Sequence, residues 1–231
     1  MPQHAVSPTP VTRVAGFSLP LVIVVTATFL LFEYPSLPDL LPVHFSRGVA
    51  DGWQYRTLPR VLIPVGVQMM LSATFGTVAM LLLSRPNGDL DRTAPDVRAA
   101  AVAAEAVVLL ASIWVLFQAY AAVSLAQLWV NTGASLPLYN LAEIAGIAAS
   151  MVVAMRAHWS LGRPEPRPFE PTHWRLGQLY KNPDDPALFV PTRDGRRWTL
   201  NFGRPVAGAL LGVVLVAGVL GPTAMLALAF R

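Results

Sequence analysis

Several long stretches of this chain consist almost entirely of apolar residues. A helix needs about 20 apolar residues to cross the hydrocarbon core of a bilayer. Stretches of about this length lie at 16–34, 61–83, 99–127, 137–156 and 206–229. Only 13% of the residues are charged, compared with about 25% in soluble domains. We therefore predict an all-α polytopic membrane protein with about five transmembrane helices.

The polar segments between the spans divide the chain into units. The first apolar stretch is too long for a signal-peptide core, so we expect it to stay in the protein as a helix. The predicted units are a tail (1–15), a two-helix unit (16–83) with a structured loop (35–60), the third and fourth helices (84–156), a Pro-rich linker (157–172), a polar module (173–205) and the last helix (206–231).

The distribution of basic residues predicts the orientation, because Lys and Arg are enriched in cytoplasmic loops. With the N-terminus inside, the inner pieces hold thirteen basic residues: Arg13, Arg85, Arg92, Arg98, Arg156, Arg163, Arg167, Arg175, Lys181, Arg193, Arg196, Arg197 and Arg204. The outer pieces hold four: Arg47, Arg56, Arg60 and Arg231. We predict a multi-pass cell-membrane protein whose N-terminus is cytoplasmic and whose C-terminus is outside.

The loop between the first two spans is expected to have a fixed shape on the outer side. Pro38 and Pro42 restrict its backbone, and Asp51-Gly52 is a typical turn dipeptide. Trp53 stands just before the second span, where amphipathic rings favour the membrane interface. The loop can therefore be interpreted as an interfacial turn that caps the helix bundle.

A second interpretation of this loop is a site for a ligand or a divalent ion. Asp39, His44 and Asp51 could supply ligands, but their spacing matches no standard metal motif. The chain contains no cysteine, which excludes thiolate sites and disulfides. No metal site is therefore predicted.

The same loop resembles the family of domain of unknown function 1648. That family has an LP-x-x-(I/L)-P-(V/I)-H-F core, then Gly, then Asp-Gly-Trp, between two membrane helices. The matching residues are Leu37, Pro38, Leu41, Pro42, Val43, His44, Phe45, Gly48, Asp51, Gly52 and Trp53. The family includes the N-terminal part of Sdp-type immunity proteins, which are bacterial membrane proteins that protect against a secreted toxin peptide and signal its presence. The resemblance implies a bacterial inner-membrane protein.

The polar module at 173–205 is expected to contain a β-hairpin on the cytoplasmic face. The stretches 188–190 and 197–202 are predicted strands around the turn Arg193-Asp194-Gly195. Aromatic residues and arginines alternate here, which suggests contact with the inner leaflet. His158 and His173 flank the Pro-rich linker and are interpreted as interfacial side chains.

This module resembles the family of domain of unknown function 5808. Its pattern opens with W-x-x-G-x-x-Y-x-NP-(D/E)-DP-x-x-FVP and closes with WT-(L/I)-NF-x-x-P. The matching residues include Trp174, Gly177, Tyr180, Asn182, Asp184, Asp185, Trp198, Asn201, Phe202 and Pro205. The resemblance implies no activity.

Two acids fall within the predicted spans, where ionisable residues are costly and often functional. Glu105 lies near one end of its span and is interpreted as an acid that reaches the cytoplasmic interface. Glu143 lies deeper, at a depth similar to Gln118 and Gln68. It stands beside a stripe of small residues and is therefore expected to face protein. Two roles stay open for these three residues: structural hydrogen bonding, or a proton or cation site.

The chain contains no catalytic motif of the HExxH, GxSxG, Walker or dinucleotide-binding type. We therefore expect a non-enzymatic binding, immunity or envelope-sensing component without a cofactor. Its expected partners are the bilayer, a peptide or small molecule outside and a protein inside, but not nucleic acid. The alternative is a small proton-coupled transporter, or a subunit of one, that uses Glu143.

Overall fold

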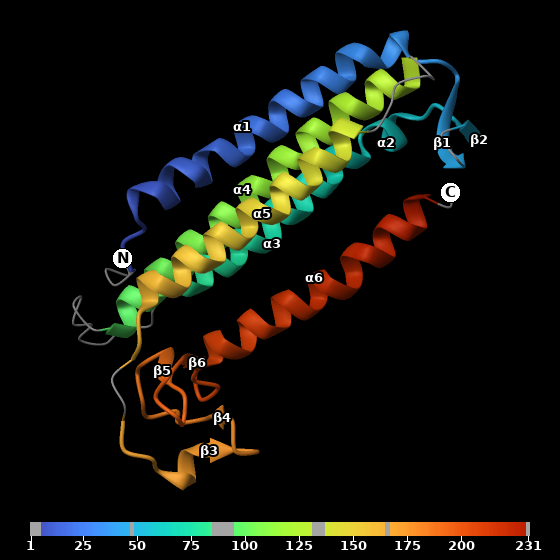
Figure 1. Cartoon of the computed structure of the whole chain (residues 1–231). Helices are drawn as coiled ribbons and strands as arrows, with labels where there is room; N and C mark the ends of the chain where they lie inside the picture. The colour runs from blue at the N-terminus through green and yellow to red at the C-terminus, as the bar shows by residue number, and fades with distance from the viewer. Residues whose placement is uncertain (1–5, 47–48, 85–94, 131–136, 165–166, 230–231) are drawn as a thin grey trace.

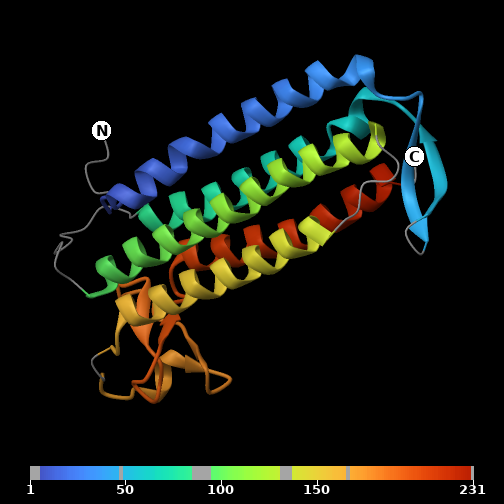
Figure 2. The same cartoon turned by 45° about the horizontal axis from the view of Figure 1, so that its top comes forward.

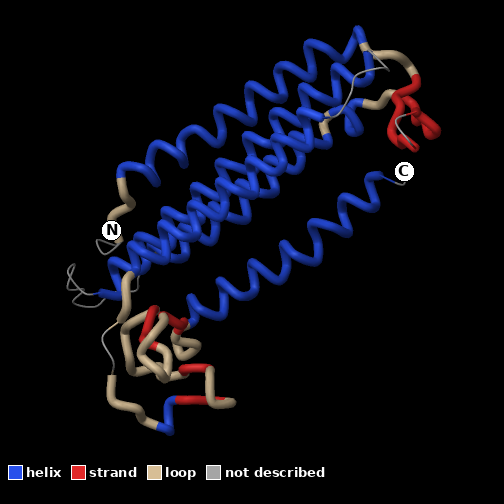
Figure 3. Tube along the Cα trace, viewed as in Figure 1, coloured by secondary structure: helices blue, strands red, loops and turns tan. Residues whose placement is uncertain are grey.

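The structure is a computed structural model that describes residues 6–46, 49–84, 95–130, 137–164 and 167–229. It is mostly helical with small antiparallel sheets (Figure 3). Five residues that the sequence analysis singles out lie outside the described residues: Arg47, Gly48, Arg85, Arg92 and Arg231.

Long apolar helices form the body of the molecule (Figure 1). They are α1 (Pro10–Glu33), α3 (Ile63–Leu83), α4 (Pro95–Val130), α5 (Pro137–Leu161) and α6 (Pro205–Ala229). The first four are long and apolar enough to cross a membrane. The prediction of a helical, membrane-embedded protein is confirmed at this level.

Two helix ends extend furthest beyond the predicted ranges, for local reasons. α1 begins earlier than predicted because Thr9 caps it: its hydroxyl accepts the backbone N–H of Thr12 at 3.1 Å, and Pro10 occupies the first turn. Both features favour a helix start. α5 continues past residue 156, into the predicted linker, because no helix-breaking residue precedes Gly162.

Helix α4 is the central helix, packing against α1, α3 and α5, while α6 packs against α3. Its buried side chains are largely alanines, among them Ala104, Ala111 and Ala122. Small side chains allow neighbouring helices to approach closely within a membrane, where dispersion replaces the hydrophobic effect. The Ala-rich sequence of α4 thus allows it to pack against several neighbouring helices.

The segment between the first two long helices forms a β-hairpin rather than an irregular loop. After the short 3-10 helix η1 (Tyr34–Ser36), strand β1 (Leu40–Ser46) pairs antiparallel with β2 (Val49–Tyr55), and the short helix α2 (Leu58–Val61) follows. The predicted turn at Asp51-Gly52 is wrong, because both residues lie within β2 and Gly52 pairs with His44. The register shifts on both sides of His44, which marks an irregularity that accommodates this pair.

The base of the hairpin is packed into the end of the helix bundle. Leu37 and Leu41 join a buried cluster with Leu30 of α1, Val61 of α2 and Trp129 of α4. Both cartoon views place the hairpin at one end of the long helices and the polar module at the other (Figures 1 and 2). The two polar units are therefore separated by the length of the helices.

The polar module contains two small sheets. After the 3-10 helix η2 (Pro171–His173), β3 (Trp174–Arg175) pairs with β4 (Leu179–Tyr180), and β5 (Phe189–Pro191) pairs with β6 (Trp198–Leu200). The second pair is the hairpin that the sequence predicts. Leu188 packs with Leu82 of α3, Val108 of α4 and Leu210 of α6, and this apolar contact joins the module to the helices.

Candidate functional site

Arg56 fixes the hairpin to the end of α1. Its guanidinium donates to the carbonyl oxygens of Tyr34 at 2.8 Å, Pro35 at 3.2 Å and Leu37 at 2.7 Å. It also pairs with the carboxylate of Asp39 at 3.1 Å. Five donors in a planar fork suit arginine to such multiple acceptors. Sequence analysis treated Arg56 only as a topology charge, so this role was missed.

The irregularity in the hairpin brings His44 against Asp51. His44 Nδ1 contacts Asp51 Oδ1, and the two side chains are 71% and 45% exposed. A Cβ added to Gly52 would lie 2.9 Å from the Cβ of His44, so only glycine allows the strands to approach this closely. Of the motif residues, the structure brings His44, Asp51 and Gly52 together.

The hairpin does not assemble the alternative metal site. Asp39 is bound to Arg56 at the base of the hairpin, and its side chain is 90% exposed. The residues that the structure describes contain no group of three His, Cys, Asp or Glu side chains able to hold a metal ion. Pro42 is buried and pairs with Trp53, while Pro38 is exposed.

Strand β2 presents one face to its surroundings. Exposure alternates along the strand, with Val49, Asp51, Trp53 and Tyr55 on the exposed face. Trp53 is 53% exposed and Tyr55 is 75% exposed. We call these four residues the β2 face. A rigid strand therefore presents two aromatic rings and an acid that is paired with His44.

Gln68 is fully buried at the centre of the helices and has a structural role. Its amide donates to the hydroxyl of Thr26 on α1 at 3.1 Å and to the carbonyl oxygen of Val115 on α4 at 3.0 Å. Its own Oε1 is buried without a hydrogen-bond partner among the described residues. Gln68 thus ties three helices together.

Glu143 does not join Gln68. It lies on an exposed face of α5, and Gln118 is half-buried on α4. No hydrogen bond links these three residues in the described part of the chain. α5 meets α4 through a neighbouring face, where Gly146 is buried against Trp114 and Ile113. Gly146 of the small-residue stripe therefore lies in the contact, whereas Glu143, which was expected to face protein, is exposed beside it.

Glu105 is the acid that the helices enclose. Its side chain is 13% exposed and contacts Arg156 of α5 at 2.6 Å. The hydroxyl of Thr9, at the start of α1, donates to the same carboxylate at 2.5 Å. Glu105 therefore joins α1, α4 and α5. In the sequence, the feature that could have indicated this ion pair is Arg156, which lies near the end of the next helix in the chain.

Asn201 organises the polar module from its interior. This fully buried side chain donates to the carbonyl oxygens of Asn182 at 2.8 Å, Asp185 at 3.1 Å and Ala187 at 3.2 Å. Its Oδ1 accepts the backbone N–H groups of Asn182 at 3.0 Å and Gly203 at 2.9 Å. Satisfying every polar atom of a buried amide stabilises one loop shape.

The acidic and amide residues of the loop around 182–187 are used within the module. Asn182 Oδ1 accepts the N–H of Asp184, and Asp185 Oδ1 accepts the N–H of Ala187. Asp185 Oδ2 accepts from Arg167 at 2.9 Å and from the Tyr180 hydroxyl at 3.1 Å. These bonds are characteristic of loops built by Asn and Asp.

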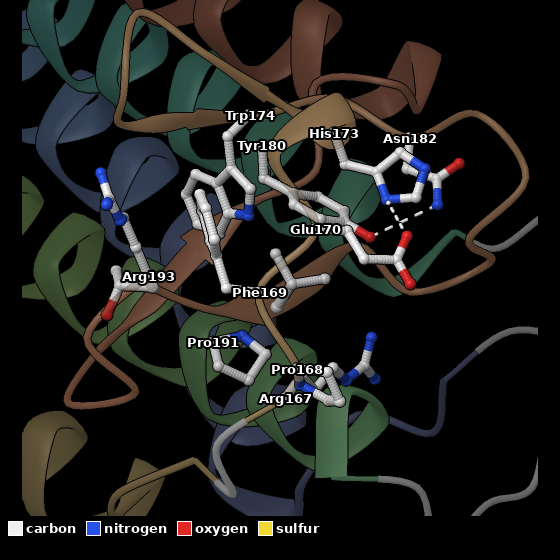
Figure 4. A pocket seen from close by; sticks show the side chains of 12 residues that line it. Arg167, Pro168, Phe169, Glu170, His173, Trp174, Tyr180, Asn182, Pro191 and Arg193 are labelled. Atoms are coloured by element: carbon white, nitrogen blue, oxygen red, sulfur yellow. Dashed lines mark hydrogen bonds and ion pairs between the residues drawn. The ribbon is translucent and has the colours of Figure 1, made fainter.

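A cavity of about 210 Å³ opens between the Pro-rich segment and the module (Figure 4). Trp174 meets Tyr180 edge-on at 5.3 Å between ring centroids, and Phe169 lies 6.3 Å from Trp174. Arg193 lies 4.5 Å over the Phe169 ring, and His173 pairs with Glu170 at 3.1 Å. The cavity therefore combines an aromatic wall with groups of both charges.

Tyr180 and Trp198 are two further residues of the predicted module motif. Burial raises the pKa of Tyr180 above its ordinary value, and the neighbouring Asp185 carboxylate acts in the same direction. Trp198 is half-buried in β6, and its indole N–H has no hydrogen-bond partner among the described residues. Trp198 therefore serves the packing of the hairpin rather than the cavity.

A scan against protein-family models finds no matching family, and searches of curated proteins and of solved structures find no similar protein. The resemblances to the two domains of unknown function and to Sdp-type immunity proteins therefore stay predictions.

Proposed function

We propose that this protein is a non-enzymatic binding component of the cell envelope, of the sensing or immunity type, with the hairpin β1–β2 as its recognition element. The observation that supports this proposal is the β2 face, whose exposed aromatic residues are held on a rigid base by Arg56. A preorganised surface loses less conformational entropy when it binds than a mobile loop does.

The chemistry of the β2 face suits a peptide. Tyr and Trp are enriched where proteins bind one another, because each offers a large apolar surface with few rotatable bonds. The exposed pair of Asp51 and His44 adds polar groups at one edge of the face. We therefore propose a secreted or envelope peptide as the ligand class.

The proposal includes five crossing helices with the hairpin outside and the module at 173–205 inside. The charge distribution supports this orientation, because most basic residues lie on the side of the module. The aromatic cavity at Trp174 and Tyr180 is then available to a protein partner inside the cell. The helices that join the hairpin to the module would connect ligand binding at the hairpin with partner binding at the module.

The transporter alternative has less support. A proton carrier needs a polar path toward both sides of the membrane. Gln68 is already bound to Thr26 and Val115, and Glu143 lies away from it on an exposed face. The arrangement of these residues therefore favours a structural role for Gln68, and in the described part of the chain no hydrogen bond or ion pair links Glu143 to Gln68 or Gln118.

A photocrosslinking experiment in living cells tests the proposed function. A photoreactive phenylalanine analogue is placed at Val49, on the β2 face, and in a matched variant at Ala50, which points away from that face. We expect the Val49 probe to give one discrete peptide adduct that disappears when Trp53→Ala is added. Adducts with lipid alone from both positions would instead identify the hairpin as a membrane anchor and contradict the proposal.

A further inference from the structure

A second recess lies where α5 ends and the β5–β6 turn approaches it. It has a volume of about 510 Å³ and is lined by His158, Trp159, Gly162, Arg163, Arg196 and Arg197. The first four belong to the end of α5 and the residues after it, and the two remaining arginines follow the turn between β5 and β6. Two segments distant in the sequence thus bring three guanidinium groups to one place.

Among the residues that the structure describes, no carboxylate in the lining of this recess balances its charge. The described lining contains no acid, and all three arginines are exposed. The ion pairs of the described residues engage other arginines, including Arg156 with Glu105 and Arg167 with Asp185. The acid of the turn, Asp194, accepts from the Thr192 hydroxyl and from the backbone N–H of Arg196. Among the described residues, Asp194 is thus the acid nearest in sequence to Arg196 and Arg197, and the turn already uses its carboxylate.

The recess lies at the level of a membrane surface. The apolar part of α5 that is suited to cross a membrane runs over Leu138–Leu161, so Gly162 and Arg163 follow its end. Trp159 is 74% exposed, and exposed indoles favour the interface between hydrocarbon and water. The recess lies at this level whichever side of the membrane the module occupies.

An apolar track leads from the recess into the hydrocarbon region. Met151, Val152 and Met155 of α5 are 60%, 58% and 44% exposed, on the same helix that carries Trp159. An acyl chain can lie along these side chains while its phosphate reaches the arginines. Arginine binds phosphate with several charge-assisted hydrogen bonds, and basic pockets beside membrane helices bind anionic headgroups.

We propose that the recess between the end of α5 and the β5–β6 turn binds the phosphate of an anionic phospholipid. The apolar track favours a lipid over a free phosphate, because only a lipid occupies both the track and the recess. This inference goes beyond the proposed recognition function, since it concerns the module and not the hairpin. A bound lipid would hold the module against the membrane surface through Arg196 and Arg197.

The test uses the full chain purified in detergent and phosphatidylglycerol as the probe, with native mass spectrometry to count retained lipid. The double variant Arg196→Gln/Arg197→Gln is compared with Arg175→Gln/Lys181→Gln, which removes the same charge from exposed positions of the same module outside the recess. We expect the first variant to retain roughly fivefold less lipid for each arginine removed. The second should retain as much as the unaltered protein.

Three outcomes would overturn the proposal. One is an equal loss in both double variants, which would indicate general charge attraction. Another is equal retention of phosphatidylcholine, and the third is displacement of the lipid by millimolar glycerol phosphate, which would indicate a soluble ligand. Arg163 lines the recess from the other segment, so the variant Arg163→Gln should also retain less lipid. It keeps the test decisive if the double variant does not fold.

Discussion

Arg56 lies over the ring of Tyr34, with its guanidinium carbon 5.0 Å from the ring centroid, and donates to the carbonyl oxygen of the same residue at 2.8 Å. This relationship joins the last residue of the hairpin region to the end of the first long helix. The backbone N–H of Arg56 also donates to the carbonyl oxygen of Asp39 at 2.7 Å. Arg56 therefore holds the base of the hairpin, together with the buried contacts of Leu37 and Leu41.

The first prediction concerns this anchor. Arg56→Lys keeps the charge but cannot reproduce the fork of donors, so we expect a loss of about 1–2 kcal/mol of stability. Hydrogen exchange of the β1 and β2 amides should accelerate, while exchange in α4 should not change. Arg175→Lys is the matched control, because Arg175 is exposed on the module. Unchanged exchange in β1 and β2 would show that Arg56 does not anchor the hairpin.

A pair of glycines tests how the polar module is built. A Cβ at Gly203 would overlap the backbone carbonyl of Asn182, whereas a Cβ at Gly208 would meet no atom within 4 Å. We expect Gly203→Ala to destabilise the module by about 3 kcal/mol, and Gly208→Ala to be neutral or slightly stabilising. Thermal unfolding followed by tryptophan fluorescence measures both. Equal stability of the two variants would mean that the 182–187 loop tolerates displacement.

The two membrane acids should differ in their effect on stability. Glu105→Gln removes the charge that pairs with Arg156, and we expect a loss of about 1–2 kcal/mol, since Arg156 is half exposed. Glu143→Gln changes an exposed side chain and should alter stability by less than about 0.5 kcal/mol. Thermal unfolding of both purified variants provides the measurement. The reverse ranking would show that Glu143, and not Glu105, is the structural acid.

The β5–β6 turn should show a defined response to acid. The hydroxyl of Thr192 and the backbone N–H of Arg196 lower the pKa of Asp194 below its ordinary value of 3.8. A carboxyl whose folded-state pKa is lowered stabilises the fold above its unfolded pKa and loses that contribution as pH falls through the folded pKa. Thr192→Val should therefore raise the pKa of Asp194 toward 3.8 and weaken this acid dependence. Carboxyl chemical shifts recorded by NMR against pH measure the change, and an unaltered titration would contradict it.

The helices and the β5–β6 hairpin could be predicted from the sequence because each depends on local signals. Apolar length marks the spans, and the turn at Asp194-Gly195 between β-forming runs marks the strands β5 and β6. The β1–β2 hairpin could not be predicted in the same way. Pro42 argues against a strand, and the typical turn dipeptide Asp51-Gly52 lies inside β2 instead.

The predicted grouping of Glu143 with Gln68 failed for a geometric reason. Depth along a helix follows from the rise per residue, which placed Glu143 level with Gln68. The direction in which a side chain points depends on the rotation of each helix, and that follows from packing. On α5, Gly146 is buried against α4 whereas Glu143 is exposed, and no hydrogen bond links Glu143 to Gln68 in the described part of the chain. Depth alone could not distinguish this arrangement from a shared pocket.

We propose that the hairpin and the polar module lie on opposite sides of the membrane, with the hairpin outside. The chain contains no cysteine, so single cysteines can be introduced at exposed positions: Tyr55→Cys in β2 and Arg175→Cys in β3. A membrane-impermeant maleimide applied to right-side-out vesicles should label Tyr55→Cys at once and Arg175→Cys only after permeabilisation. Labelling of both positions in sealed vesicles, or of Arg175→Cys alone, would contradict the account.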